Sequence, residues 1–271
     1  MKIGIVGTGA LGGWYAALLA EAGHEVHCLA RSDFKAIQDN GLTIRNKGQG
    51  RTVRVASASP DAAKIGPCDL IVVTIKSTSN YALPELVTPL LGPSTIVVTL
   101  QNGMGNVEAL AKLLPVERVV AGLCFVCINR LAPSVIDTTL AGYVRMAAAT
   151  GPISVAVETC VTTFAAAGVA EQVRLAAAWR PDAVVIACFG DPGLEAAREA
   201  TDAPVLGIAE AAFHAAGMLA TGFSVVTTMT RTCIMAERLV QRYGMHHQCR
   251  GIHGTDIPVL ALECCGEATL Q

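Results

Sequence analysis

Short apolar runs rich in β-branched residues alternate along the chain with longer stretches rich in Ala and Leu. The short runs have the length and composition of buried strands, and the longer stretches have those of helices. The predicted strands are residues 2–6, 25–29, 70–74, 95–100, 119–126, 183–187, 205–208, 223–227 and 258–262. The predicted helices are residues 10–22, 81–91, 107–114, 192–200, 209–220 and 231–243. Because uniformly apolar strands that alternate with helices form parallel sheets covered on both faces, the pattern predicts an α/β fold.

The charged residues divide the chain near residue 147. All six lysines lie before residue 113, and the second half carries arginine alone. The first 147 residues hold 13 basic and 10 acidic side chains, a formal charge of +3, and the remainder holds 7 and 12, a formal charge of −5. This asymmetry predicts two units of different origin, a first domain over residues 1–147 and a second over residues 148–271. We expect the junction in the Ala-rich stretch 146–149.

The composition excludes several classes of protein. With 52% hydrophobic and 15% charged residues, the chain has enough apolar material for a buried core and is not disordered. A net charge of −2 and 4% aromatic residues give no basis for binding nucleic acid. The charge-free runs 86–107 and 211–230 contain Gly and Thr, which favours a helix end, a turn and a strand over a membrane span. The apolar run that ends at Gly7 is too short for a signal peptide, so we expect a cytoplasmic protein without membrane contact.

The ten cysteines do not have the spacing of a small disulfide-linked scaffold. Cys124 and Cys127 form a C-x-x-C pair, but no second pair at zinc spacing follows it. We therefore expect no metal site and interpret most thiols as small buried hydrophobes.

The first predicted strand leads into a glycine-rich turn. Residues 2–12 read K-I-G-I-V-G-T-G-A-L-G, which places three glycines between a strand and the start of a helix. The first glycine of such a turn allows a tight bend, the second lets the backbone approach a pyrophosphate, and the third lets the helix pack on the strand. The N–H groups at the helix start then bind the phosphates. The predicted cofactor-binding segment is Gly7, Thr8, Gly9, Ala10, Leu11 and Gly12.

Arg31 follows the second predicted strand, where an NAD-dependent enzyme has an acidic residue for the ribose. A guanidinium there favours the 2′-phosphate of NADP, and an arginine in a solvated loop is the alternative interpretation. Lys76 and Asn102 follow two later strands, at the edge where ligands bind in such sheets. Each also has a simpler interpretation, as a surface lysine and as an ordinary Asn-Gly turn.

Over about residues 1–147 the sequence resembles the ketopantoate reductase family. The matching segments are the opening K-I-G-I-V-G-T-G-A-L-G, Arg31, V-V-T-I-K ending at Lys76, and Q-N-G-M-G around Asn102. The resemblance implies a Rossmann-type doubly wound parallel sheet in which Arg31 binds the 2′-phosphate. It also implies that Lys76 and Asn102 border the nicotinamide and the keto-acid pocket as cofactor-binding and catalytic residues. The reaction implied is hydride transfer from NADPH to the ketone of a 2-keto acid.

The family completes its site with a helical second domain, from which a lysine protonates the forming alkoxide. No lysine follows Lys112 in this sequence. A general acid is worth roughly 10²–10⁴-fold in rate, and an arginine cannot replace it because it keeps its proton near neutral pH. We therefore expect a protein that binds NADPH and is impaired in ketone reduction.

In the second half, a predicted strand delivers Cys188 to a turn of sequence F-G-D-P-G. A thiol at this position would lie at the ligand-binding edge of a sheet, near the positive ends of helices. A buried core cysteine is the alternative interpretation, and the spacing alone does not choose between them.

Over about residues 151–263 the sequence resembles the aspartate/glutamate/hydantoin racemase superfamily. The matching segments are V-V-I-A-C-F-G-D-P-G around Cys188, V-L-G-I-A-E-A-A at 205–212, F-S-V-V-T-T-M at 223–229 and I-P-V-L-A-L-E at 257–263. The resemblance implies a cofactor-independent reaction in which two cysteines, one of them Cys188, face opposite sides of a substrate carbon. The substrate-binding residues that it implies are Phe189, Gly190, Asp191, Glu210, Thr227 and Thr228.

The second cysteine of that family lies in a later turn that this sequence does not contain, so we expect a truncated racemase-like α/β unit. Cys233, Cys264 and Cys265 are alternative partners for Cys188. Three hypotheses follow: an NADPH-dependent oxidoreductase acting on a 2-keto acid, a racemase of amino acids or hydantoins, and a non-catalytic NADPH-binding fusion. We also expect the second unit to pack an exposed apolar face on the first domain or on a second copy, forming a homo-oligomer.

Overall fold

The apolar runs predicted as strands in the first half pair with one another in parallel. Val6, at the end of strand β1 (Lys2–Val6), lies beside Leu29 on one side and Val73 on the other. Six parallel strands follow the order β5-β2-β1-β6-β7-β8, which is the order of a doubly wound sheet. Their bounds are β2 Glu25–Leu29, β5 Ser57–Ser59, β6 Leu70–Val73, β7 Ile96–Thr99 and β8 Val119–Ala132. The predicted α/β fold is confirmed.

Beyond β8 the sheet becomes mixed. Strand β9 (Val135–Ala148) pairs antiparallel with β8, and the short hairpin of β3 (Leu42–Asn46) and β4 (Gln49–Val53) adds to β9 through β3. The prediction of a strand over 119–126 was too short, and β9 was not predicted. Residues 122–129 of β8 alternate between half-buried and exposed, and its last four residues are exposed, so this part lacks the uniformly apolar signature of the central strands.

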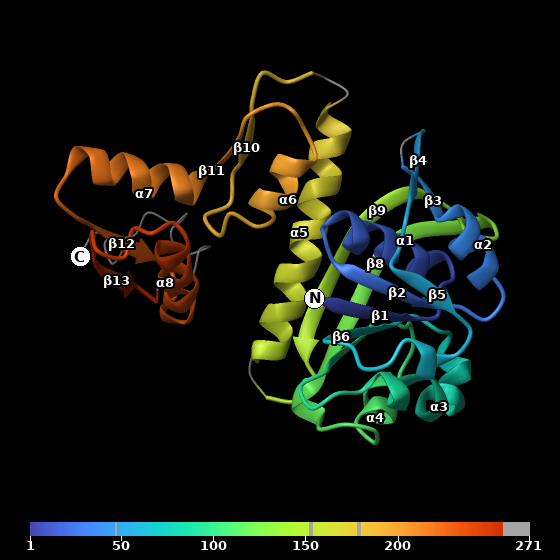
Figure 1. Cartoon of the computed structure of the whole chain (residues 1–271). Coiled ribbons are helices and arrows are strands. Elements are labelled where there is room, and N and C mark those ends of the chain that lie inside the picture. Colours follow the sequence, from blue (N-terminus) through green and yellow to red (C-terminus); the bar gives the residue numbers. More distant parts are fainter. Residues whose placement is uncertain (47, 152–153, 178–179, 257–271) are drawn as a thin grey trace. The chain divides into compact units, whose positions relative to one another are not determined.

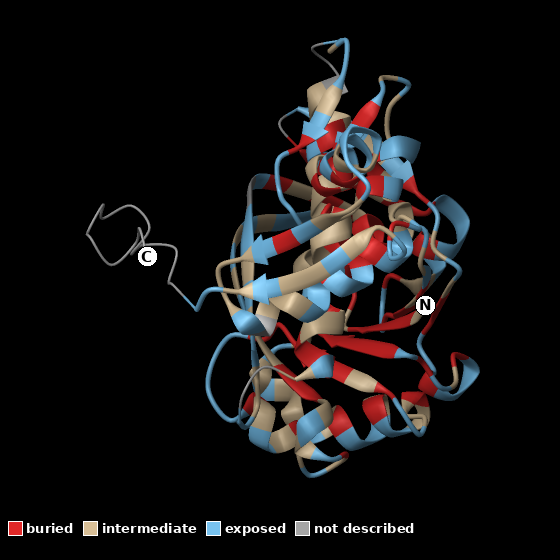
Figure 2. Cartoon of the chain, turned by 90° about the vertical axis from the view of Figure 1, so that its left-hand side faces the viewer, coloured by how far each residue is buried: buried red, intermediate tan, exposed pale blue. Residues whose placement is uncertain are grey.

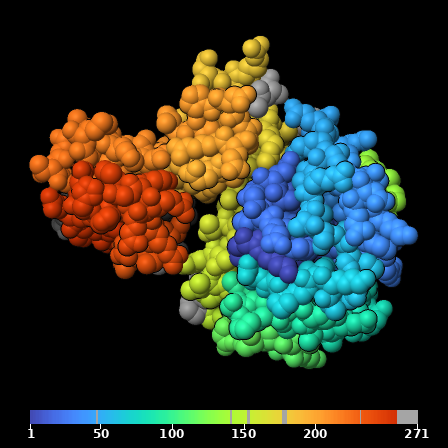
Figure 3. Space-filling model, in the orientation of Figure 1, coloured from blue at the N-terminus to red at the C-terminus, as the bar shows by residue number. Residues whose placement is uncertain are grey.

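The chain divides into two units, Met1–Gln172 and Val173–Gln271. The computed structural model describes residues 1–46, 48–151, 154–177 and 180–256, and Figure 1 shows their elements in chain order. The first unit, coloured from blue through green to yellow, forms one continuous body in the space-filling view of Figure 3. The predicted domain boundary at residue 147 falls beside the end of β9 and stays a prediction.

Helices cover both faces of the large sheet, and many of the buried residues lie on its central strands and on α1 (Figure 2). On one face, α1 (Ala10–Glu21) shares a core with the first part of α5 (Val155–Ala177), through Trp14, Val157 and Cys160. The other face is covered by α3 (Leu83–Val87) and α4 (Asn106–Leu110). The predicted helix over 81–91 is therefore wrong in length. Its α-helical part is α3, flanked by the 3₁₀ turns 77–82 and 88–90, because Pro84 and Pro89 supply no backbone N–H.

The second unit contains two short parallel ladders. Strand β10 (Val184–Ile186) pairs with β11 (Val205–Gly207), and β12 (Phe223–Thr227) pairs with β13 (Cys249–Gly254). Within the described residues no ladder joins the two pairs. Helices α6 (Leu194–Glu199), α7 (Ile208–Leu219) and α8 (Cys233–Arg242) separate the strands, and α7, α8 and β12 share a small core around Phe213. The strand predicted over 258–262 lies outside the described residues.

Candidate functional sites

A crevice of about 700 Å³ opens at the carboxyl ends of β1, β2 and β6. The chain crosses from one side of β1 to the other between β5 and β6, and ligands of doubly wound sheets bind at this switch point. The lining includes seven of the predicted cofactor-binding residues: Gly7, Thr8, Gly9, Ala10, Leu11, Arg31 and Lys76. Gly12 lies in α1 against the carbonyl oxygen of Gly7, outside the lining, and Asn102 lies on a neighbouring loop. The fold thus brings together predicted residues as far apart in the sequence as Gly7 and Lys76.

The three glycines of the turn have different surroundings. Gly7 has a φ of +98°, a conformation that other residues rarely adopt. A Cβ on Gly12 would lie 2.2 Å from the carbonyl oxygen of Gly7 and 2.5 Å from Oγ1 of Thr74. A Cβ on Gly9 would meet no atom within 4 Å. These surroundings fit the tight bend, the close packing and the open approach that the spacing predicts.

The first turn of α1 borders the crevice and offers backbone donors to it. Gly9 is the N-cap and has no side chain that could accept from them, and the first turn contains no acidic residue. The N–H groups of a helix start need an acceptor, and a bound anion supplies one. Arg31, Lys76 and Arg130 line the crevice against two acidic residues, Asp33 and Glu85, which leaves a formal charge of +1. The crevice is therefore suited to an anionic ligand.

Asn102 is exposed on a loop that a network of side-chain amides holds in place. Nε2 of Gln101 donates to Oδ1 of Asn80 (2.7 Å), and Nδ2 of Asn80 donates to Oδ1 of Asn106 (2.8 Å). Nδ2 of Asn106 in turn donates to the carbonyl of Gly103 (3.1 Å). This network fixes the backbone on both sides of Asn102. Its side chain does not line the crevice, so its role beside a nicotinamide stays a prediction.

Asp33 and Arg130 are crevice residues that the sequence did not single out. The Asp33 carboxylate is buried, and Nε of Arg130 lies 3.2 Å from its Oδ2. Almost one hundred residues separate the two in the chain, and only the pairing of β8 and β9 with the rest of the sheet brings them together. No local sequence motif predicts this contact between Asp33 and Arg130.

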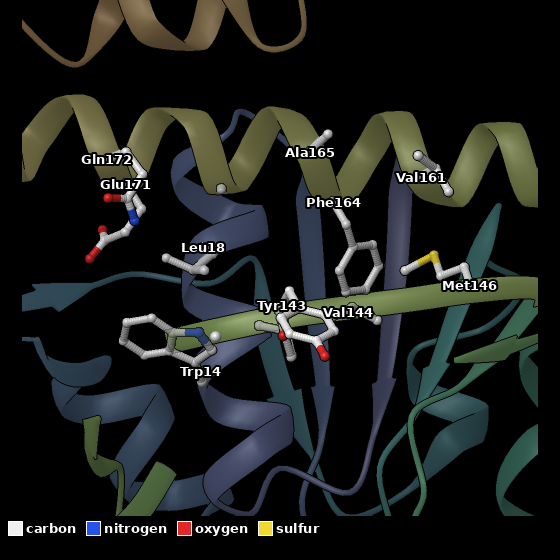
Figure 4. Close-up of a pocket in the computed structure, with 13 residues that line it drawn as sticks. Trp14, Leu18, Tyr143, Val144, Met146, Val161, Phe164, Ala165, Glu171 and Gln172 are labelled. Atoms are coloured by element: carbon white, nitrogen blue, oxygen red, sulfur yellow. The ribbon is translucent and has the colours of Figure 1, made fainter. Parts of the chain in front are cut away.

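A second, smaller pocket of about 250 Å³ lies between α1, β9 and α5. Figure 4 shows the ring of Phe164 pointing from α5 toward Tyr143 on β9, with Trp14 of α1 farther along the same space. At one end, the Glu171 carboxylate accepts from Nδ2 of Asn46 (2.7 Å) and pairs with Arg51. The lining is mainly apolar, and this carboxylate is already engaged, so we assign no chemistry to the pocket.

Cys188 is exposed directly after β10, at the carboxyl end of that strand. Its carbonyl oxygen accepts from the N–H of Asp191 at 2.9 Å, which closes the turn predicted from F-G-D-P-G. Cys233, one of the alternative partners, is half-buried at the start of α8, and Cys264 and Cys265 lie outside the described residues. The thiol is therefore accessible, and its catalytic role stays a prediction.

Asp191 has a structural part in this turn. Its side chain is fully buried and accepts from the N–H groups of Ala209 (3.0 Å) and Glu210 (2.8 Å) at the start of α7. It also accepts from the hydroxyl of Tyr243 at 2.8 Å, and burial together with this carboxylate raises the pKa of Tyr243. A Cβ on Gly207 would lie 2.4 Å from the Asp191 carboxyl carbon, so the glycine makes room for the contact. These partners occupy the carboxylate that the sequence assigned to substrate binding.

Three of the other residues predicted to bind a racemase substrate also have side-chain partners. Glu210 forms an ion pair with Arg198 at 2.5 Å. Oγ1 of Thr227 lies 2.8 Å from Oγ1 of Thr232, and the ring of Phe189 packs edge-on against Phe213 with centroids 5.6 Å apart. Thr228 is half-buried. Gly190 lies beside α8, where an added Cβ would lie 3.8 Å from the methyl carbon of Met235. Their substrate-binding roles stay predictions.

The fold and the crevice together define a doubly wound α/β unit of the Rossmann type with a crevice at its switch point, followed by a second α/β unit. Residues 3–151 match the family model described as ketopantoate reductase PanE/ApbA, and residues 125–270 match that of Asp/Glu/hydantoin racemase. Each match spans more than half of the chain, and the two overlap on the β8–β9 hairpin. The chain belongs to the ketopantoate reductase family in its N-terminal part and to the Asp/Glu/hydantoin racemase family in its C-terminal part.

Individual relatives match one part each. A 2-dehydropantoate 2-reductase of Nostoc sp. is 42% identical over 130 residues, which cover 48% of this chain and 41% of the relative. A hydantoin racemase of Pseudomonas sp. is 48% identical over 104 residues, which cover 38% of this chain and 42% of the relative. The crystal structure of 2-dehydropantoate 2-reductase from Geobacter metallireducens is similar with a TM-score of 0.59 at 33% identity, covering 66% of both chains. The chain thus spans about two fifths of the length of the curated relatives that it matches.

Two other kinds of feature are absent from the described residues. No described helix is long and apolar enough to cross a membrane. In the same part of the chain, no group of three or more His, Cys, Asp or Glu side chains could hold a metal ion.

Proposed function

We propose that the first unit binds NADPH in the 700 Å³ crevice and is an oxidoreductase of the ketopantoate reductase type. The observation that carries this proposal is the meeting of three features in one place at the switch point of the sheet. These are the uncapped start of α1, the open approach at Gly9 and the guanidinium of Arg31. Membership of a family that uses NADPH supports the same conclusion.

Each residue has a definite task in this proposal. The N–H groups at the start of α1 bind the pyrophosphate, and Gly12 lets the helix come close enough to the strand to present them. Arg31 binds the 2′-phosphate at the adenosine end. Lys76 and the loop of Asn102 border the nicotinamide end. NADPH, when bound, would supply a hydride to the ketone of a 2-keto acid.

The step for which this chain supplies the fewest candidate residues is the delivery of a proton to the forming alkoxide. No lysine follows Lys112, and an arginine does not release a proton near neutral pH. We therefore expect the chain by itself to bind NADPH and to reduce 2-dehydropantoate slowly. Its rate of reduction should be roughly 10²–10⁴-fold lower than that of an enzyme with a general acid.

The test is a fluorescence titration of the full chain with NADPH and with NADH, followed by a turnover assay with 2-dehydropantoate. Binding of NADPH, weakened in Arg31→Asp with a shift of preference toward NADH, would support the proposal. The matched control is Arg145→Gln, which removes an exposed arginine that does not line the crevice. Failure of the wild-type chain to bind NADPH at millimolar concentration would overturn the proposal.

A racemase activity of the second unit is the alternative, favoured by the exposure of Cys188 at a strand end. It predicts deuterium incorporation from solvent at the α-carbon of an amino acid or at the corresponding carbon of a hydantoin. Cys188→Ser should abolish the exchange, and Cys127→Ser, which changes an exposed thiol of the first unit, should leave it intact. Equal exchange in both variants would refute a role for Cys188. Cofactor binding without turnover in either assay would favour the non-catalytic fusion.

A further inference from the structure

The end of β2 carries an acidic residue as well as Arg31. Asp33 follows Arg31 by two residues and lines the same crevice. In NAD-dependent sites an acidic residue in this region accepts from the ribose hydroxyls. A free carboxylate here would therefore oppose a 2′-phosphate, which carries a charge of about −1.5 to −2 at neutral pH.

The Asp33 carboxylate is buried and has three partners within hydrogen-bond or ion-pair distance. The hydroxyl of Ser32 donates to its Oδ1 (2.9 Å), and the N–H of Ser134 donates to its Oδ2 (3.4 Å). The same Oδ2 lies 3.2 Å from Nε of Arg130, and only 5% of the Asp33 side chain is exposed. A buried carboxylate needs such a positive partner, because desolvation otherwise penalises its charge.

Arg130 reaches Asp33 from the far end of β8 and remains accessible itself. Its side chain is 42% exposed and lines the crevice together with Arg31. The contact with Asp33 uses Nε, so the two terminal nitrogens keep four N–H groups that can donate to a ligand. Without Arg130 the charged lining of the crevice would be balanced, with Arg31 and Lys76 against Asp33 and Glu85.

We propose that Arg130 is a specificity-determining residue that makes the crevice select NADPH over NADH. It neutralises the one carboxylate at the adenosine end and presents a second guanidinium, beside that of Arg31, to the 2′-phosphate. This inference rests on the proposed binding of NADPH and adds a residue that neither the glycine motif nor the end of β2 contains. Arg31 supplies the local cation, and Arg130 removes the competing anion.

The test compares NADPH and NADH affinities of the full chain in Arg130→Gln, Asp33→Asn and the double variant. A hydrogen bond to a charged group is worth roughly 1.5–3 kcal/mol, so Arg130→Gln should weaken NADPH binding about ten- to a hundredfold. NADH binding should change by less than about threefold, since NADH lacks the 2′-phosphate. Adding Asp33→Asn to Arg130→Gln should recover part of the NADPH affinity, because it removes the negative charge that Arg130 no longer neutralises.

Two further variants keep the test decisive. Arg130→Lys retains the positive charge and should retain the preference for NADPH even if Arg130→Gln folds poorly. Arg145→Gln, the control outside the crevice, should leave both affinities unchanged. A wild-type chain that prefers NADPH and an Arg130→Gln variant with the same ratio of affinities would overturn this inference alone. A wild-type chain that binds neither cofactor would instead overturn the proposed function on which it rests.

Discussion

Alanine substitutions at Gly12 and Gly9 separate the packing of α1 from its binding of a ligand. In Gly12→Ala, the new Cβ would lie 2.2 Å from the Gly7 carbonyl oxygen and 2.5 Å from Oγ1 of Thr74. Thr74 is not free to turn away, because its hydroxyl donates to the same carbonyl at 2.6 Å. Ordinary contacts between carbon atoms are about 3.5–4.0 Å, so α1 has to move from β1 by roughly 1 Å.

The expected cost follows from this displacement. Overpacking of a core costs roughly 1–3 kcal/mol, and the better helix propensity of alanine returns about 0.5–1 kcal/mol. A net loss of about 1–2 kcal/mol corresponds to a fall in Tm of roughly 2–8 °C for a protein of this size. In Gly9→Ala the Cβ meets nothing within 4 Å, so Tm should stay within about 1 °C of the wild type. Its methyl group enters the space proposed for the pyrophosphate, so NADPH affinity should fall by about tenfold or more.

The assay is a pair of measurements on each full-length variant: a thermal melt followed by circular dichroism, and a fluorescence titration with NADPH. Gly12→Ala should lose both stability and affinity, and Gly9→Ala should lose affinity alone. If Gly9→Ala binds NADPH as the wild type does, the pyrophosphate does not lie at the start of α1. If Gly12→Ala melts at the wild-type temperature, the account of helix packing is wrong.

Three further predictions concern stability. Gly168→Ala in the middle of α5 should raise the free energy of unfolding by about 0.5–1 kcal/mol in a urea titration, because its Cβ meets no atom within 4 Å. Burial raises the pKa of Cys28 and Cys160 to about 12, whereas thiols of the unfolded chain ionise near pH 8.5. The free energy of unfolding should thus keep its full value below about pH 8.5 and decrease as the pH rises above it, and equal values at pH 7.5 and pH 10 would contradict this. Asp191→Ala should destabilise the second unit by roughly 1–3 kcal/mol in the same titration, because two N–H groups of α7 lose their acceptor.

The fold was predictable where one local pattern determines an element. The central strands are uniformly apolar, and their predicted bounds agree with the structure to within about two residues at each end. Helix α5 was not predicted, because the stretch over 155–177 mixes Thr, Val and Gly with Ala and has no distinct apolar stripe. Its position depends on packing against α1 and on the pairing of Glu171 with Arg51, which are contacts between distant parts of the sequence.

The residues of the candidate site also fall into those that a local pattern predicts and those that only distant contacts bring together. The glycine turn and Arg31 were found because the turn and the end of β2 each need particular residue types at fixed spacing. Arg130 was not found, because its position beside Asp33 depends on the register of a long hairpin and on the order of strands in the sheet. Asp191 was assigned to substrate binding from its neighbours in the sequence, and the structure shows it buried against the start of α7.

The starts of α1 and α7 present the same physical problem with two different solutions. Every helix begins with backbone N–H groups that lack a partner within the helix. At α7 the buried carboxylate of Asp191 accepts two of them, so the protein satisfies this helix from its own side chains. At α1 the N-cap is Gly9, no acidic residue lies in the first turn, and the space beyond is open. An anion from solution would therefore gain little at α7 and would complete the unsatisfied start of α1, which is why we place the ligand of this chain in the first unit.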